Sequence, residues 1–383
     1  MIDRRSLLRS GALGGLALGL VPRMAFAKAA TDRRFVFIIQ RGACDGLSVV
    51  APVGDPAFAG QRGDLARDFD DAPKLDAMFA LHPSLVKTAA LYQDGQALFA
   101  HAVASPYRDR SHFDGQNVLE TGGINAYQVR DGWLNRLLGV LPAGEAKAIA
   151  VAATVPMALR GPNKVSSYAA SYLPDASADM TQRVSMLYAG DNQLHALWNE
   201  AMATDKLAGG VVAAKQNAAA TGALAAKLLT PADGARIAMI ETTGWDTHTG
   251  QRGRLATQLK TLDGLVESLH AGLGPLWNDT LVLVATEFGR TVAINGTNGT
   301  DHGTASAAML LGGAVKGGRV VADWPGLKPA QLYQGRDLKP TTPLDALIGG
   351  AVAEHFVVAP DRAMAALFPP SAKVAAVNGL IRA

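Results

Sequence analysis

The chain has 383 residues, of which 49% are hydrophobic and 18% charged, so a large core can form and general disorder is excluded. Its formal net charge is only +3, and no run of Lys or Arg lies beyond the N-terminus, so no nucleic-acid partner is indicated. A single cysteine, Cys44, excludes an intrachain disulfide.

The first 27 residues have the composition of an export signal. Arg4 and Arg5 precede an apolar stretch that runs through Leu20, and Ala25-Phe26-Ala27 offers a small-residue cleavage site. The paired arginines resemble a twin-arginine signal, and an ordinary secretory signal is the alternative. We therefore expect the twin-arginine (Tat) export machinery as a partner and a periplasmic or secreted location. The apolar stretch is too short to span a membrane, and no later run reaches spanning length.

From Asp32 onward, short apolar runs alternate with longer stretches of helical spacing, which predicts an α/β fold with a mostly parallel sheet covered by helices. The predicted strands are Phe35–Ile39, Ala97–Ala102, Ala148–Ala153, Ile237–Glu241, Leu281–Ala285 and Met309–Leu311. The clearest helices are Leu255–Leu273 and Thr342–His355. Thr341 or Thr342 would cap the second, with Pro343 in its first turn.

Residues 175–228 differ from the rest of the chain because they lack a strong strand signal. They are rich in alanine and contain two helical patterns, Thr181–Asn199 and Val211–Leu228. We expect a helical insertion here, within a single domain that spans residues 28–383.

Four clusters of acidic residues and histidines lie beside the predicted strands. They are Gly42-Ala43-Cys44-Asp45-Gly46, Gly244-Trp245-Asp246-Thr247-His248, Glu287-Phe288-Gly289-Arg290 and Asp301-His302-Gly303. Open α/β sheets form their sites at the carboxyl ends of parallel strands, so these side chains are expected to converge. Asp, Glu and His are ligands of divalent metals, and the sequence therefore indicates a metalloenzyme.

Two of these clusters each allow two interpretations. Asp246 and His248 are two residues apart, so in an extended segment both can reach one metal, whereas the alternative is a solvated turn. A buried Glu287 needs a cation or a metal. It therefore either pairs with Arg290, or binds the metal and leaves Arg290 to hold an anionic substrate.

The remaining candidates are similarly open. Asp45 is either a metal ligand or the N-cap of a following helix. His302 can bind metal while Asp301 orients it as an acceptor. Ser111 opens a predicted helix, where it is either a metal-activated nucleophile or an N-cap paired with Asp114.

Together these motifs resemble the DUF1501 family, which consists mainly of exported bacterial proteins and is grouped with the alkaline phosphatase and sulfatase superfamily. The residues that carry the resemblance are Gly42-Ala43-Cys44-Asp45-Gly46-Leu47, Ser111-His112-Phe113-Asp114, Gly244-Trp245-Asp246-Thr247-His248, Glu287-Phe288-Gly289-Arg290-Thr291, Asp301-His302, Leu311-Gly312-Gly313 and Lys316-Gly317-Gly318. The similarity runs from about Arg34 to the C-terminus.

The resemblance implies an alkaline phosphatase-like three-layer α/β sandwich and a metal-dependent hydrolase of phosphate or sulfate esters, with an anionic ester as substrate. The implied divalent metal is Zn, Mn or Ca, and its implied ligands are Asp45, Asp246, His248, Glu287 and His302. Ser111, His112 and Arg290 are the implied catalytic residues. Phe288 stands where the superfamily has a histidine, which favours the alternative of a non-catalytic periplasmic metal-containing binding or assembly factor.

Overall fold

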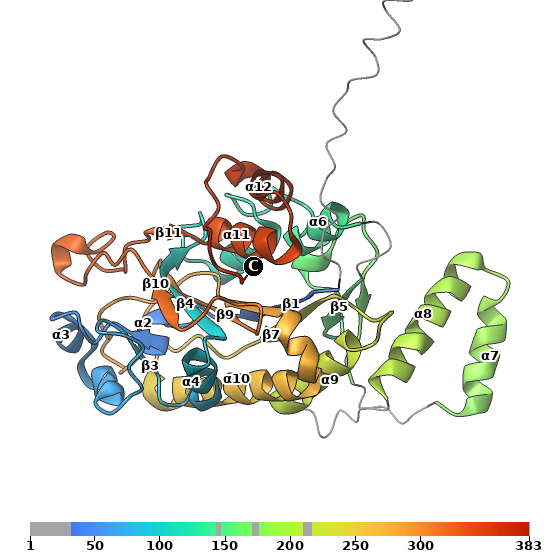
Figure 1. Ribbon diagram of the computed structural model, residues 1–383, viewed down its shortest axis with the longest axis horizontal. Helices are drawn as coiled ribbons and strands as arrows, with labels where there is room; N and C mark the ends of the chain where they lie inside the picture. The colour runs from blue at the N-terminus through green and yellow to red at the C-terminus, as the bar shows by residue number, and fades with distance from the viewer. Residues whose placement is uncertain (1–31, 143–146, 171–175, 210–216, 383) are drawn as a thin grey trace, which may run out of the picture.

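A computed structural model describes residues 32–142, 147–170, 176–209 and 217–382. The predicted export signal lies outside the described residues. Within them, a central sheet is covered by helices on both faces, which makes three layers (Figure 1). No helix in these ranges is long and apolar enough to cross a membrane.

The sheet is mixed but mostly parallel. Its strand order is β10-β4-β9-β8-β1-β7-β5-β6, and β11 also pairs with β4. Only β9 runs antiparallel to its neighbours, β4 and β8; the other pairs in this sheet are parallel. The strands are β1 (Arg34–Gln40), β4 (Ala97–Ala104), β5 (Ala148–Val151), β6 (Ser166–Ser167), β7 (Ile237–Thr242), β8 (Thr280–Ala285), β9 (Ser306–Leu311), β10 (Arg319–Val321) and β11 (Thr342–Pro343); β2 (Val50–Ala51) and β3 (Ala80–Leu81) form a separate pair.

Helices fill the outer layers. The α-helices are α2 (Gly46–Val49), α3 (Phe58–Arg62), α4 (Val86–Gln93), α5 (His112–Thr121), α6 (Trp133–Val140), α7 (Ala178–Tyr188), α8 (Asn192–Ala208), α9 (Ala218–Leu229), α10 (Gln251–Leu273), α11 (Leu344–Phe356) and α12 (Pro360–Leu367). Short 3₁₀ turns are Gly63–Phe69, Met157–Leu159, Gly274–Asp279, Pro329–Gln331 and Pro369–Ser371. Each of the six predicted strands is present, and the predicted α/β class is confirmed.

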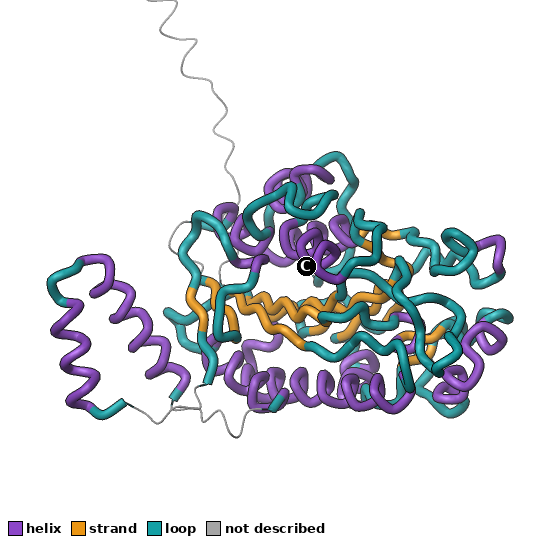
Figure 2. The backbone as a smooth tube through the Cα atoms, turned by 180° about the vertical axis from the view of Figure 1, so that it is seen from behind, coloured by secondary structure: helices purple, strands orange, loops and turns teal. Residues whose placement is uncertain are grey.

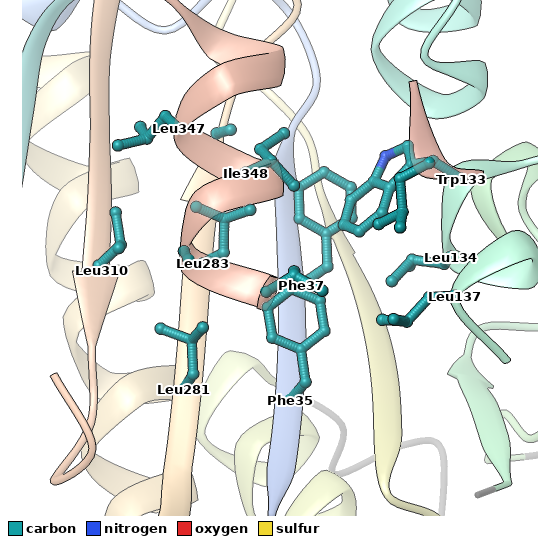
Figure 3. Close-up of a cluster of buried hydrophobic side chains, with 14 of the residues drawn as sticks. Phe35, Phe37, Trp133, Leu134, Leu137, Leu281, Leu283, Leu310, Leu347 and Ile348 are labelled. Atoms are coloured by element: carbon teal, nitrogen blue, oxygen red, sulfur yellow. The ribbon is translucent and has the colours of Figure 1, made fainter. Parts of the chain in front are cut away.

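Strand β1 shows how the core is divided between the two faces of the sheet. Successive side chains of a strand point to opposite faces. Phe35 and Phe37 accordingly pack with Trp133 of α6, the second pair with ring centroids 5.2 Å apart (Figure 3). Val36 and Ile38 belong to the core on the other face. A continuous apolar run is thus required here, because both faces are buried.

The helices divide between the same two faces. Helices α6, α11 and α12 pack on the face of Phe35, and α4, α9 and α10 pack on the opposite face, where α10 runs along the sheet (Figures 1 and 2). Helix α10 confirms the predicted helix over Leu255–Leu273, beginning four residues earlier.

The predicted cap of α11 is wrong. Its N-cap residue is Pro343, without a side-chain cap hydrogen bond, rather than Thr341 or Thr342. The reason is that Thr342 and Pro343 are extended and pair with Val103 and Ala104 of β4, so the helix starts only at Leu344.

The region predicted as a helical insertion contains three helices with different surroundings. Helices α7 and α8 lie side by side and extend away from the sheet (Figure 1), and no described residue of α7 is buried. Helix α9 instead packs against α10 through buried residues such as Leu224 and Leu228. Residues 171–175 and 210–216 lie outside the described part of the chain.

Candidate metal centre

Three of the four predicted clusters meet at one edge of the sheet. Asp246 and His248 follow β7, and Glu287 and Arg290 follow β8, at the carboxyl ends of parallel strands. His302 precedes β9, whose antiparallel direction brings its start to the same edge. Helix α5, which follows β4, adds the side chain of His112.

Asp246 lies at the centre of this group. Its Oδ1 accepts from Arg290 Nη1 at 2.8 Å and lies 3.1 Å from His248 Nε2 and 3.5 Å from His302 Nε2. Its Oδ2 lies 3.5 Å from His112 Nε2. Burial acts to raise the pKa of Asp246, but the hydrogen bond and charge of Arg290 outweigh it and hold the pKa below its usual value. The carboxylate is therefore charged and faces three imidazole rings.

Each of these rings is held through its other nitrogen. His112 Nδ1 lies 2.8 Å from Glu287 Oε1, and His248 Nδ1 lies 3.0 Å from Asp301 Oδ1. His302 Nδ1 lies 2.9 Å from the carbonyl oxygen of Arg110. Ionised carboxylates and carbonyls only accept hydrogen bonds, so each Nδ1 carries the proton. Each Nε2 is thereby left with a lone pair, as a metal ligand requires.

The atoms at the centre fit a metal ion. His112, Asp246 and His302 offer ligand atoms that all lie within 4.8 Å of one another. His248 Nε2 adjoins them, 2.9 Å from His302 Nε2. His112 Nε2 is buried and has no hydrogen-bond partner among the described residues. Three imidazoles and one carboxylate are the donor set of a borderline divalent metal.

The environments of the histidines differ. The hydrogen bond that His112 donates to Glu287 raises the pKa of His112, whereas burial, aided by the nearby His112, lowers the pKa of His302. His248 is the most open of the three, with 42% of its side chain exposed, so the centre faces solvent on this side.

Glu287 lies behind His112. It is fully buried, and its Oε1 accepts from Gly42 N at 2.8 Å and Gln116 Nε2 at 3.1 Å as well as from His112. Thr286 Oγ1 donates to Oε2 at 2.9 Å. Burial acts to raise the pKa of Glu287, but the hydrogen bonds, first that of His112, hold it below its usual value. Glu287 is therefore a charged carboxylate that orients the ring of His112.

Arg290 pairs with Asp246, and no ion pair between Arg290 and Glu287 exists among the described residues. Its Nη2 is buried without a hydrogen-bond partner in the part of the chain that the structure describes. The backbone is fixed by an antiparallel bridge between Arg290 and His302, where Gly303 N donates to the carbonyl of Gly289 at 2.8 Å. Glycine is needed at both positions, because a Cβ on either would lie within 2.5 Å of backbone atoms.

Asp45 lies outside this group. It caps α2, accepting from Leu47 N at 3.2 Å and Ser48 Oγ at 2.9 Å, and it pairs with the buried Arg62. Gln251 donates to the same carboxylate. The N-cap alternative is therefore the arrangement present.

Ser111 is the N-cap residue of α5 and directly precedes His112. Its side chain makes no cap hydrogen bond, so the pairing with Asp114 that the alternative required is absent. Its N–H donates to Tyr107 Oη at 3.1 Å.

Two roles differ from the sequence-based expectation. Asp301 was expected to orient His302 but bonds to His248 instead. The carbonyl of Arg110, a residue with φ of +60°, holds His302. His112 was expected to be catalytic, and it lies in the group of side chains around Asp246. The sequence signal that could have placed His112 in this group was its position at the start of a helix that follows a strand.

Comparisons with known proteins agree with the family resemblance. The model of a family described as "Protein of unknown function (DUF1501)" matches residues 32–358. No curated protein matches the chain.

Similar solved structures are distant. The zinc complex of the C-terminal periplasmic domain of EcEptC from Escherichia coli has 9% identity and a TM-score of 0.40, covering 74% of each chain. The phosphonate monoester hydrolase of Agrobacterium radiobacter has 11% identity and a TM-score of 0.33, covering 76% of this chain and 70% of its own. The alkaline phosphatase from the Antarctic bacterium TAB5 has 10% identity and a TM-score of 0.36, covering 74% and 92%.

Proposed function

The chain belongs to the DUF1501 family, and we propose that it is an exported, metal-dependent hydrolase of phosphate or sulfate esters. One observation carries the proposal: three imidazole Nε2 atoms face the carboxylate of Asp246, while each Nδ1 is held by an acceptor. Such a set of lone pairs is stabilised by a cation.

The proposed ligands are His112, Asp246 and His302, with His248 as the fourth. Because imidazole dominates this set, zinc or manganese suits it better than calcium, which prefers six or more oxygen ligands. When bound, such a metal supplies Lewis acidity and lowers the pKa of a water molecule or hydroxyl group.

The protein's own residues prepare the site. Glu287 and Asp301 orient two of the rings, and Arg290 orients Asp246. The buried guanidinium of Arg290 would add positive charge close to an ester bound at the centre. Phe288 stacks on His112, with ring centroids 5.1 Å apart, and excludes water from that side of the ring.

We propose Ser111 as the nucleophile. It lies at the N-terminus of α5, where the helix dipole stabilises negative charge, and it adjoins the ligand His112 in the chain. A divalent metal ion at the proposed ligands, together with this helix end, would attract an anionic ester more strongly than a neutral one.

The test starts from purified protein expressed as the full chain. We expect about one equivalent of zinc or manganese by elemental analysis, and hydrolysis of 4-nitrophenyl phosphate or 4-nitrophenyl sulfate that chelation abolishes. Protein without metal, and without hydrolysis under any added metal, would refute the proposal.

A second candidate function is a periplasmic metal-containing binding or assembly factor. Phe288 favours it, because this buried ring occupies the position where the superfamily pattern has a histidine. Stoichiometric metal together with no hydrolysis across the ester panel would support this function instead.

A further inference from the structure

Helix α5, which carries His112, also forms one wall of an open cavity of about 630 Å³. Phe113, Gln116, Asn117 and Glu120 line it, at the spacing of one helix face. Tyr127, Arg130 and Arg160, which follow α5 in the chain, also line it.

A hydrogen-bond chain connects this cavity to the metal centre. Gln116 lines the cavity and its Nε2 donates to Glu287 Oε1, which also accepts from His112 Nδ1. Gln116 and His112 are four residues apart on α5, which is a rise of about 6 Å along the helix. That length is roughly the span of one aromatic or sugar ring.

The cavity has unbalanced positive charge. Arg130 and Arg160 are both exposed, and Arg130 has no hydrogen-bond or ion-pair partner among the residues that the structure describes. Arg160 uses its Nε to bond the carbonyl of Val155 at 2.9 Å. The acidic residue of the lining, Glu120, pairs with Arg41 at 2.9 Å, and Arg41 also pairs with Glu241.

Two aromatic side chains are presented to solvent beside these arginines. Phe113 is 82% exposed and Tyr127 is 66% exposed. Tyr127 also has a left-handed backbone, with φ of +61°, which is held by a hydrogen bond from its N–H to Asn117 Oδ1 at 2.7 Å. Strain of this kind at a non-glycine residue is typical of ligand clamps.

We propose that this cavity binds the organic part of the substrate, and that this part has a ring and a second anionic group. The ring would lie against Phe113 and Tyr127, and the second anion would bind Arg130 and Arg160, whose guanidinium groups suit carboxylate, phosphate or sulfate. This inference rests on the proposed function, since it takes the reacting ester to lie at the metal centre.

The test compares two non-hydrolysable ligands by calorimetry on zinc-loaded protein. Phenylphosphonate has the ring alone, and 4-carboxyphenylphosphonate adds the second anion. We expect the carboxylated ligand to bind about 10-fold or more tightly, as one charge-assisted hydrogen bond provides. Benzenesulfonate and 4-sulfobenzoate repeat the comparison for a sulfate-like group.

The variant that decides is Arg130→Gln with Arg160→Gln, in which the ratio of the two dissociation constants should fall to about 1. Arg254→Gln, an exposed arginine of α10, is the matched control and should keep the wild-type ratio. Equal binding by the wild type, or a preference that survives the double replacement, would overturn this inference and leave the proposed function standing. Failure of the wild type to bind any of the four ligands would refute the proposed function, and this inference with it.

Discussion

The Nε2 atoms of His248 and His302 lie 2.9 Å apart, although the Nδ1 of each ring faces an acceptor that must receive its proton. With both rings neutral, two lone pairs meet and no hydrogen bond joins them. A shared cation, either a proton or a metal ion, relieves this contact. Asp246 Oδ1, within 3.5 Å of both atoms, gives the same position a negative charge.

The first prediction concerns Asp246. Replacement by Asn removes the charge that faces the three imidazoles but keeps the size of the side chain. We expect bound zinc, measured by elemental analysis after gel filtration, to fall from about one equivalent to a small fraction. Asp64→Asn is the matched control and should retain metal, since this exposed residue pairs with Arg67 and with no other described residue. Full metal content in Asp246→Asn would place the metal elsewhere.

The second prediction concerns Glu287, which orients His112. In Glu287→Gln the amide cannot accept every hydrogen bond that the carboxylate receives, so His112 should be held less well. Loss of such an outer partner typically weakens metal binding about 10- to 100-fold. Competition with a chromophoric chelator measures the dissociation constant. Glu267→Gln, at an exposed residue paired with Lys87, should not change it. An unchanged affinity in Glu287→Gln would show that Glu287 does not support the site.

The third prediction is a loss of stability in acid caused by His101. This buried ring bonds to the carbonyl of Val50 through Nε2 and accepts from Ala102 N through Nδ1, so its neutral form is fully satisfied. Burial lowers the pKa of His101 from 6.5 to about 4. Between these values only the unfolded chain binds the proton, so the free energy of unfolding decreases as the pH falls from 6.5 to about 4. The contribution is about 3 kcal/mol over that range.

Urea unfolding at several pH values measures this effect. His101→Gln should unfold with a pH dependence that is shallower by about 1.4 kcal/mol per pH unit below pH 6, the value for one proton. Gln193→Asn, on the exposed helix α8, removes no titratable group and should keep the wild-type slope. If His101→Gln also keeps it, the ring is not the group that takes up the proton on unfolding.

The fourth prediction concerns export. Arg4→Lys with Arg5→Lys should retain the chain in the cytoplasm if the paired arginines are read by the twin-arginine machinery. Cell fractionation and immunoblotting measure the distribution. Lys316→Arg with Lys328→Arg, which changes as many basic residues far from the N-terminus, is the control. Normal export of the variant with Arg4→Lys and Arg5→Lys would favour an ordinary secretory signal.

The strands of this fold could be predicted because the central sheet is buried on both faces. Such strands need continuous apolar runs, and Phe35–Ile39 and Leu281–Ala285 are of this kind. The start of α11 could not be predicted, because Thr342 and Pro343 are taken into the sheet by β4, a partner more than 200 residues away.

The residues of the candidate site also divide into those whose place could be predicted from the sequence and those whose place could not. The convergence of Asp246, His248 and His302 could be expected because positions at strand ends are visible in the sequence. The place of His112 beside them depends on a hydrogen bond to Glu287, 175 residues away, and no local pattern carries that information. Asp45 has the same sequence signal as Asp246, but Arg62 and Gln251 bond to it, and both come from outside its own motif.

The last prediction tests the close backbone contact that shapes the site. Gly289 lies between Glu287 and Arg290. A Cβ there would lie 1.8 Å from the carbonyl oxygen of Ala305, so Gly289→Ala forces apart the segments that contain Gly289 and Ala305. We expect a loss of about 1–3 kcal/mol in the free energy of unfolding, as for overpacked cores, together with weaker metal binding because Arg290 and His302 share this bridge. Gly264→Ala is the control: nothing lies within 4 Å of its Cβ in the interior of α10, so it should stabilise the protein by about 0.5–1 kcal/mol. If Gly289→Ala is as stable as Gly264→Ala and binds metal normally, the separation of these two segments does not define the site.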